Sequence, residues 1–185
     1  MLYVAPTVTN LTSGTKFEHY GYYRIGTSDD EDGNTAMTLS VSGTSKGYYI
    51  DLANPATVTL TNIDATLRNK EFLRGVNNSA AYVYNIDGAN RIYTKGDYAI
   101  YANYNTSSTV KLMGNGTLTV TSSNPDYCGI LASNYQSSND NSIDNKYGTT
   151  DTEVDVSTQL AADGYTVKRV PVLTMSTAPT PGSTQ

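Results

Sequence analysis

The chain has one cysteine, one histidine and no tryptophan, and these shortages exclude several kinds of site. A single thiol, Cys128, cannot form an internal disulfide, and its apolar neighbours predict a small buried side chain rather than a nucleophile. A single imidazole, His19, cannot build a histidine metal site, and the sequence identifies no nucleophile that it would activate as a general base. We therefore expect His19 to be an exposed or capping residue.

Long apolar runs and basic stretches are also missing. No segment approaches the roughly 20 apolar residues that a membrane-spanning helix needs, so we expect a protein that does not span a membrane. Charged residues make up 16% of the chain and the net charge is -5. Because no basic stripe is present to neutralise phosphates, the composition argues against a nucleic-acid partner.

Threonine, serine, asparagine and glycine are abundant, and only 38% of the residues are hydrophobic. These residues favour turns and strand surfaces over helices. A surface of hydroxyl and amide groups is typical of extracellular β proteins. Residues 1–6 are too short for a signal peptide and lack its basic start. We expect an extracellular or cell-surface protein whose export signal is absent from this chain.

Alternating apolar and polar residues predict several half-buried strands, notably Met37–Val41, Tyr48–Leu52 and Thr57–Ile63. The length suits a single domain. We divide the chain into an irregular N-terminal cap at 1–34, with one possible strand from Lys16 to Ile25, β-coils and closing strands at 35–175, and an extended tail or linker at 176–185. Later strands are expected at 152–156 and 164–170.

A tyrosine-rich strand phrase occurs four times, at residues 47–54, 81–90, 97–104 and 126–135. Stacked copies of one short strand can bury a continuous core, and coils of about 20 to 30 residues with loop insertions fit the uneven spacing. The pattern predicts an all-β fold, a single-stranded right-handed parallel β-helix, with an antiparallel β-sandwich as the alternative. In the β-helix, Ile50, Ile100 and Ile130 lie close together.

Two further predictions concern the register of the repeat and the turn at Gly114–Gly116. Val58 and Leu60 match Val110 and Leu112 in the repeat, which suggests that they occupy equivalent places in their coils. The segment Gly114–Gly116 separates two alternating strands and suits either a hairpin turn or a corner between two faces of one coil.

The acidic turn at 28–34 resembles a calcium loop, with Asp30 and Asp32 at the third and fifth positions. Ser28 at the first position and Leu39 at the twelfth do not fit that loop. Asp30 and Asp32 are therefore weak metal candidates, and a solvated turn explains them as well. No cofactor is predicted.

Two segments carry a likeness to a known group of proteins. Residues 54–66 read N-P-A-T-V-T-L-T-N-I-D-A-T and residues 112–121 read L-M-G-N-G-T-L-T-V-T, each after a Y-x-I strand. These coils resemble those of right-handed parallel β-helix surface proteins of gut Bacteroidetes, of the carbohydrate-binding-domain-containing type. The likeness covers residues 36–135, and A-A-D-G-Y-T-V-K-R at 161–169 is similar too. It implies secretion and contact with glycans or surfaces, and it supplies no catalytic residues.

Sixteen tyrosines stand against two phenylalanines, and outward tyrosines of stacked strands would form a row. We expect a non-catalytic module that binds a polysaccharide, a cell-surface glycan or another surface partner. The candidate ligand-binding residues are Tyr49, Tyr82, Tyr84, Tyr101 and Tyr104. Packing within the fold is the alternative role for each of these tyrosines.

Two other functions fit the sequence less well. A structural or adhesive fibre or pilus-type element would expose apolar faces at an interface. A polysaccharide lyase or hydrolase would need clustered carboxylates or a cationic base, and the nearest cluster is Asp87, Arg91, Lys95 and Asp97. Surface salt bridges explain that cluster as well.

Overall fold

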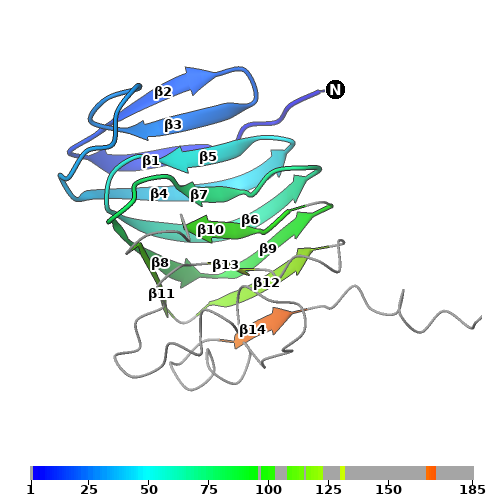
Figure 1. The fold of residues 1–185 in the computed structure, drawn as a ribbon. Coiled ribbons are helices and arrows are strands. Elements are labelled where there is room, and N and C mark those ends of the chain that lie inside the picture. Colours follow the sequence, from blue (N-terminus) through cyan, green and yellow to red (C-terminus); the bar gives the residue numbers. More distant parts are fainter. Residues whose placement is uncertain are drawn as a thin grey trace, which may run out of the picture.

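The computed structural model describes residues 2–95, 97–102, 108–114, 116–122, 130–131 and 166–169 (Figure 1). Throughout these ranges the regular elements are β-strands, so the all-β prediction is confirmed, and no helix that could cross a membrane occurs in them. The strands are β1 Thr7–Thr12, β2 Thr15–His19, β3 Tyr22–Gly26, β4 Met37–Lys46, β5 Tyr49–Leu52, β6 Ala56–Leu67, β7 Leu73–Gly75, β8 Ala81–Asp87, β9 Ala89–Thr94, β10 Ile100–Ala102, β11 Thr109–Gly114, β12 Thr117–Ser122, β13 Ile130–Leu131 and β14 Thr166–Arg169.

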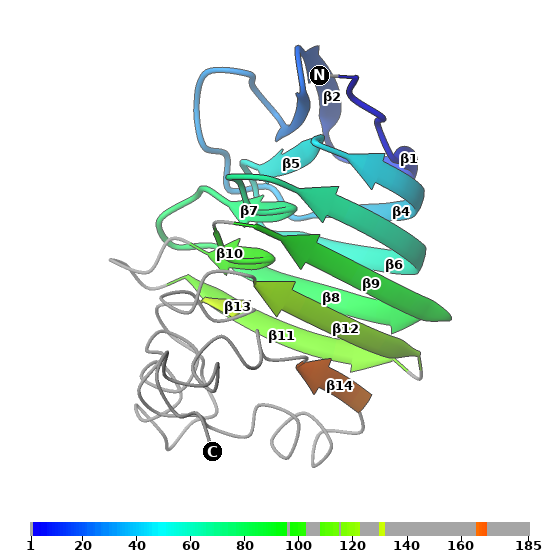
Figure 2. The same ribbon diagram turned by 90° about the vertical axis from the view of Figure 1, so that its right-hand side faces the viewer.

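The strands form two sheets, and the chain passes back and forth between them, except that β2 and β3, β8 and β9, and β11 and β12 are consecutive strands of the same sheet. The long sheet has the order β1-β4-β6-β9-β12-β14, with β8 paired to β6 and β11 paired to β8. The short sheet has the order β13-β10-β7-β5-β3-β2. Figure 2 shows the coils lying on one another with their strands aligned. Because neighbours from β3 to β14 pair in parallel, the fold is a β-solenoid of about three turns, and the antiparallel β-sandwich is excluded.

The predicted stack of isoleucines is confirmed. Ile50 of β5 pairs with Leu73 of β7, Leu73 pairs with Ile100 of β10, and Ile100 pairs with Ile130 of β13. Ile50, Leu73 and Ile100 are fully buried. The side chains of Ile50, Leu73 and Ile100 therefore lie one under another and contribute to a continuous apolar interior.

The predicted match of Val58 and Leu60 with Val110 and Leu112 is wrong by two residues. Val58 of β6 pairs with Tyr84 of β8, and Tyr84 pairs with Leu112 of β11. Leu112 thus lies in the column of Val58, where Val110 was expected. Since a shift of two keeps every side chain on the same face, the alternation of apolar and polar residues does not distinguish the two registers.

The hairpin alternative for the Gly114–Gly116 segment is excluded by the pairing of the strands on either side of it. β11 before it pairs with β8, and β12 after it pairs with β9, so the two strands are not partners in a hairpin. Gly114 has a φ of +104°, and an added Cβ would lie 2.2 Å from the carbonyl oxygen of Ile86 in the coil beneath. Glycine is therefore required by both backbone conformation and space.

The prediction that residues 1–34 are irregular is wrong where β1, β2 and β3 form. Residues 16–25, expected as one strand, form β2 and β3, which pair in antiparallel fashion around a turn at Gly21, where φ is +85°. β3 continues in parallel with β5 and so belongs to the solenoid. β1 and β2 pair in antiparallel fashion with β4 and β3 and close one end of both sheets.

Near the other end of the chain, β14 lies within the strand expected at 164–170 and pairs with β12. The expected strand at 152–156, the tail at 176–185 and Cys128 lie outside the described residues.

Candidate ligand-binding site

Two of the predicted binding tyrosines, Tyr82 and Tyr84, lie inside the solenoid. Both side chains are fully buried, so the prediction that they face outward is wrong. They share the inner face of β8 with Ile86, because alternate residues of a strand point the same way. Tyr82 fills the interior beside Gly75, which has no side chain there. Neither ring can receive a ligand from solvent, and Tyr104 lies outside the described residues.

Tyr49 and Tyr101 do lie on the outer face of the short sheet, partly exposed, as predicted. The rings of this face pack against one another. Tyr49 stacks on Tyr22 with 4.8 Å between ring centroids and 4° between planes, and Tyr22 stacks on His19 at 4.5 Å. The guanidinium of Arg74 lies 5.5 Å from the centroid of Tyr49. This stacked column therefore uses its ring faces internally and offers mainly ring edges to solvent.

Tyr101 also has an aromatic neighbour, because the ring of Tyr98 lies 6.1 Å away at an interplanar angle of 27°. Part of the predicted row of outward tyrosines is therefore present, and the rings in it pack largely against other side chains of the protein.

A cluster of charged side chains lies beside the stacked column. Arg74 of β7 is 3.4 Å from Asp51 of β5 and 3.4 Å from Glu71. These contacts are ion pairs rather than well-aligned hydrogen bonds, since Asp51 Oδ1 and Arg74 Nε have no hydrogen-bond partner. Burial raises the pKa of both Asp51 and Glu71, and the positive charge of Arg74 opposes the rise. Arg74 therefore partly offsets the negative charge of both carboxylates.

Two carboxylates of the acidic turn contact side chains of the first hairpin. Asp29 accepts a 2.7 Å contact from His19, and Asp32 is 3.2 Å from Arg24. The backbone N–H of Asp30 donates to Ser28 Oγ. Asp30 and Asp32, the weak metal candidates, are therefore not brought together around one point. Within the described ranges, no group of three or more His, Cys, Asp or Glu side chains is arranged to hold a metal.

The residues considered for a lyase or hydrolase are engaged separately. Asp87 accepts a hydrogen bond from Thr61, and Arg91 forms an ion pair with Asp64 of the neighbouring coil. Asp97 accepts from the backbone N–H of Tyr98. Asp87 and Asp97 thus have different partners, and the fourth residue of the cluster, Lys95, contributes to a cavity.

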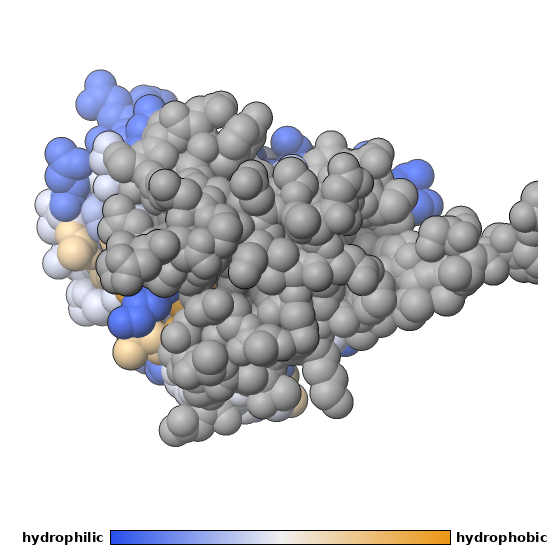
Figure 3. All heavy atoms as spheres, turned by 60° about the horizontal axis from the view of Figure 1, so that its bottom comes forward, coloured by the Kyte–Doolittle hydropathy of each residue, from blue (hydrophilic) through white to orange (hydrophobic). Residues whose placement is uncertain are grey.

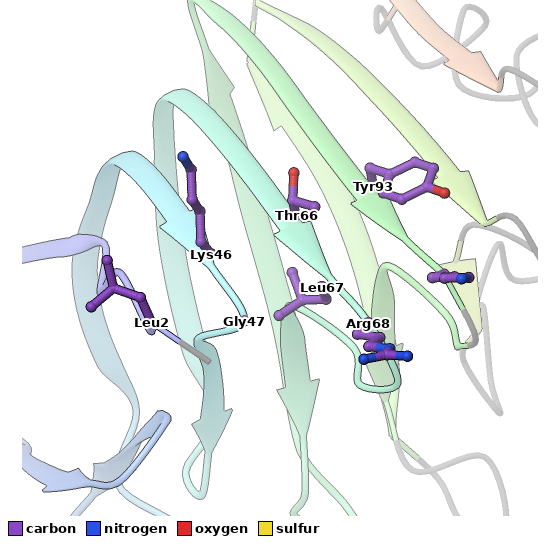
Figure 4. Close-up of a pocket in the computed structure, with 8 residues that line it drawn as sticks. Leu2, Lys46, Gly47, Thr66, Leu67, Arg68 and Tyr93 are labelled. Atoms are coloured by element: carbon purple, nitrogen blue, oxygen red, sulfur yellow. The ribbon is translucent and has the colours of Figure 1, made fainter.

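That cavity has a volume of about 340 Å³ and opens at the ends of β4, β6 and β9 (Figure 4). Lys46, Thr66 and Tyr93 form a row across the three strands, because Lys46 pairs with Thr66 and Thr66 with Tyr93. All three project to the outer side of the long sheet. The lining residues are Leu2, Lys46, Gly47, Thr66, Leu67, Arg68, Tyr93 and Lys95.

The cavity combines an aromatic ring, apolar side chains and cations. Three of its eight lining residues, Lys46, Arg68 and Lys95, are cationic, and none is Asp or Glu. Tyr93 is half-buried, and no aromatic ring among the described residues stacks on it. A partly enclosed space with an available ring face and a few polar groups suits a small ligand. The Lys46–Tyr93 pocket, defined by these lining residues, is the candidate site.

The sequence does contain a signal for this pocket, which is the placement of cations at strand ends. Lys46-Gly47 and Lys95-Gly96 each lie at the end of an alternating strand and shortly before a tyrosine, and Arg68 directly follows β6. When strands stack in a solenoid, cations at the ends of successive strands lie next to one another at one corner of the coils. Tyr93 itself lies outside the recurring phrase, which is why it was missed.

Comparison with known proteins gives no match: no family model, no curated protein and no solved structure matches this chain. The resemblance to β-helix surface proteins stays a prediction.

Proposed function

We propose that the protein is a non-catalytic module that binds a glycan in the Lys46–Tyr93 pocket. The observation that carries the proposal is the ring of Tyr93, which borders a cavity of about 340 Å³ without an aromatic partner among the described residues. A sugar ring presents an apolar C–H face that packs on an aromatic ring, while its hydroxyls need hydrogen-bond partners. Thr66 and the three cations supply such partners.

A binding role is favoured over glycoside hydrolysis by the chemistry of the lining. Most glycoside hydrolases use a pair of carboxyl groups, one on each side of the scissile bond. The lining residues of the pocket include no Asp or Glu. Lys, Arg and Tyr side chains at this site can hold and orient a ligand.

An extracellular or cell-surface location is part of the same proposal, and it rests on the composition. Only 16% of residues are charged, and hydroxyl and amide side chains dominate the outer positions of the strands. On the end of the molecule near β14, the visible described residues are mostly hydrophilic or intermediate with small hydrophobic areas (Figure 3). Such a surface remains soluble with few charges.

The fibre alternative receives less support from the described surface. Its exposed large hydrophobic residues are Leu2 on the N-terminal segment, Tyr20 in the first hairpin and Met113 on β11. Three such side chains are too few to make the continuous apolar face that an assembling fibre would bury.

The proposal is tested by isothermal titration and thermal shift against a panel of neutral and acidic oligosaccharides. We expect at least one saccharide to bind, and Tyr93→Ala to weaken it by about tenfold, by analogy with base stacking on an aromatic ring, which contributes about 1–3 kcal/mol. Tyr20→Ala, which removes an 84% exposed ring elsewhere, is the matched control and should bind normally.

Three results would contradict the proposal. The first is the absence of any binding across the panel, and the second is binding that Tyr93→Ala leaves unchanged. The third is cleavage of the bound saccharide, seen as new reducing ends or as unsaturated products that absorb in the ultraviolet.

A further inference from the structure

We infer that the Lys46–Tyr93 pocket selects saccharides that carry a negatively charged group, a uronic acid carboxylate or a sulfate ester. This inference rests on the proposed glycan binding and names the class of ligand. Its basis is the local reversal of charge: the whole chain is acidic, with a net charge of -5, whereas the pocket lining has three cations and no acid.

The three cations come from three successive coils and lie at the ends of three different strands. Lys46 is the last residue of β4, Arg68 follows the last residue of β6, and Lys95 follows the last residue of β9. All three are exposed. Because the coils stack in register, the ends of these strands lie at one edge of the long sheet. The inference rests chiefly on Lys46 and Arg68, to which Lys95 adds its charge.

The register fixes how such a ligand would lie. Lys46, Thr66 and Tyr93 occupy equivalent positions on adjacent parallel strands, which are spaced about 4.8 Å apart. A sugar packed on Tyr93 therefore has Thr66 at its side and Lys46 one strand further on (Figure 4). The guanidinium of Arg68 offers a planar pair of N–H donors, which matches the two oxygens of a carboxylate or sulfate.

The apolar part of the pocket argues for a saccharide over a bare inorganic anion. Leu67 is buried beneath the rim and Leu2 is 86% exposed beside it, so both present hydrocarbon to the cavity. The aliphatic stems of the lysines add to this surface while their ammonium groups reach solvent. Such a site binds a group with one apolar face and one charged edge, as a uronate or sulfated sugar has.

Matched pairs of ligands provide the test. Titrations compare α-1,4-linked tetragalacturonate with α-1,4-linked galactotetraose, which differ only at C6, and a sulfated galactan oligosaccharide with its desulfated form. We expect the acidic member of at least one pair to bind tenfold or more tightly. Lys46→Gln and Arg68→Gln should each weaken it about tenfold, the loss expected for one charge-assisted hydrogen bond. Lys111→Gln, an exposed cation on β11, is the control.

Ionic strength gives a second measurement that needs no variant. At about 1 M salt the Debye length falls to about 3 Å, so acidic ligands should bind more weakly and neutral ligands about equally well. Comparison of the carboxylate and sulfate pairs shows which anionic group the pocket takes.

The outcomes separate this inference from the proposed function. Equal binding of acidic and neutral partners, or loss of affinity in Lys111→Gln as large as in Arg68→Gln, overturns the selectivity for acidic sugars and leaves glycan binding standing. Binding of inorganic sulfate as tight as the sulfated oligosaccharide also overturns it, because the sugar would then contribute nothing. If no saccharide binds, both proposals fall.

Discussion

Two tyrosines of β8 lie side by side in the core and differ in what their hydroxyl groups contact. The hydroxyl of Tyr82 donates to the carbonyl of Leu52 at 3.1 Å and accepts from the N–H of Asn77 at 3.1 Å. The hydroxyl of Tyr84 is buried and has no hydrogen-bond partner among the described residues. Burial raises the pKa of both phenols, so both are neutral at physiological pH.

The contrast predicts opposite effects of the same substitution. Tyr82→Phe should lower the free energy of unfolding by about 1–3 kcal/mol, because it leaves a buried N–H and a buried carbonyl without their partner. Tyr84→Phe should be neutral or stabilise by up to about 1 kcal/mol, since it removes an unpaired buried hydroxyl. Urea denaturation of the two variants measures both values. Equal losses in the two variants would contradict this account of the core.

The sequence predicts less about these residues than about the strands that hold them. Tyrosine has an apolar body and a polar tip, so its identity alone does not decide between core and surface. Ile86, two residues after Tyr84, identifies the inner face of β8 and was the signal available. For Tyr49 the outer face follows from the alternation with Ile50, whereas the stacking on Tyr22 depends on the neighbouring coil.

Among the elements, β5 and β7 are held together by charge as well as by backbone hydrogen bonds. Asp51 of β5 is only 7% exposed, and Arg74 of β7 compensates both Asp51 and Glu71. Removing two carboxylates from water has a cost that one guanidinium only partly offsets, which is why the pKa of each carboxyl is raised.

The raised pKa values predict how stability depends on pH. A carboxyl whose pKa is higher in the folded than in the unfolded state binds its proton more tightly when folded, so its contribution is present below the unfolded pKa. That contribution is lost as the pH rises above the ordinary pKa of Asp51, 3.8, and through its raised folded value. Asp51→Asn should therefore flatten the decline in unfolding free energy over this range.

The measurement is urea denaturation as a function of pH for the wild type and the variant. Asp64→Asn removes an exposed carboxylate that is paired with Arg91 on the long sheet, and it serves as the control. If Asp64→Asn flattened the profile as much as Asp51→Asn, burial of Asp51 would not be the cause.

The elements also show which parts of the architecture can be predicted. The alternation of apolar and polar residues identified the strands and their inner faces, and the repeat identified the stacking of Ile50, Ile100 and Ile130. The two-residue error at Val58 arose because both registers bury the same face, so the choice depends on loop lengths. The first hairpin was not predicted because its turn, Tyr20-Gly21, lies within a run of alternating aromatic residues that is typical of one strand.

At the scale of the whole molecule, the candidate site exists only because coils stack. Lys46, Thr66 and Tyr93 are far apart in the sequence and adjacent across three strands, and no single coil contains the pocket. The closed end formed by β1 and β2 leaves the first coil without a free parallel edge. The proposed site is formed by residues that are adjacent across neighbouring strands rather than by a local sequence motif, so no short sequence signature indicates it.

The most direct test is a backbone amide chemical-shift titration with the acidic oligosaccharide that binds most tightly. The account predicts that the amides around Lys46, Thr66 and Tyr93 shift together and saturate with one dissociation constant, because one ligand contacts the ends of β4, β6 and β9. Shifts centred on Tyr49 and Tyr101 of the short sheet, or confined to one continuous stretch of sequence, would contradict it.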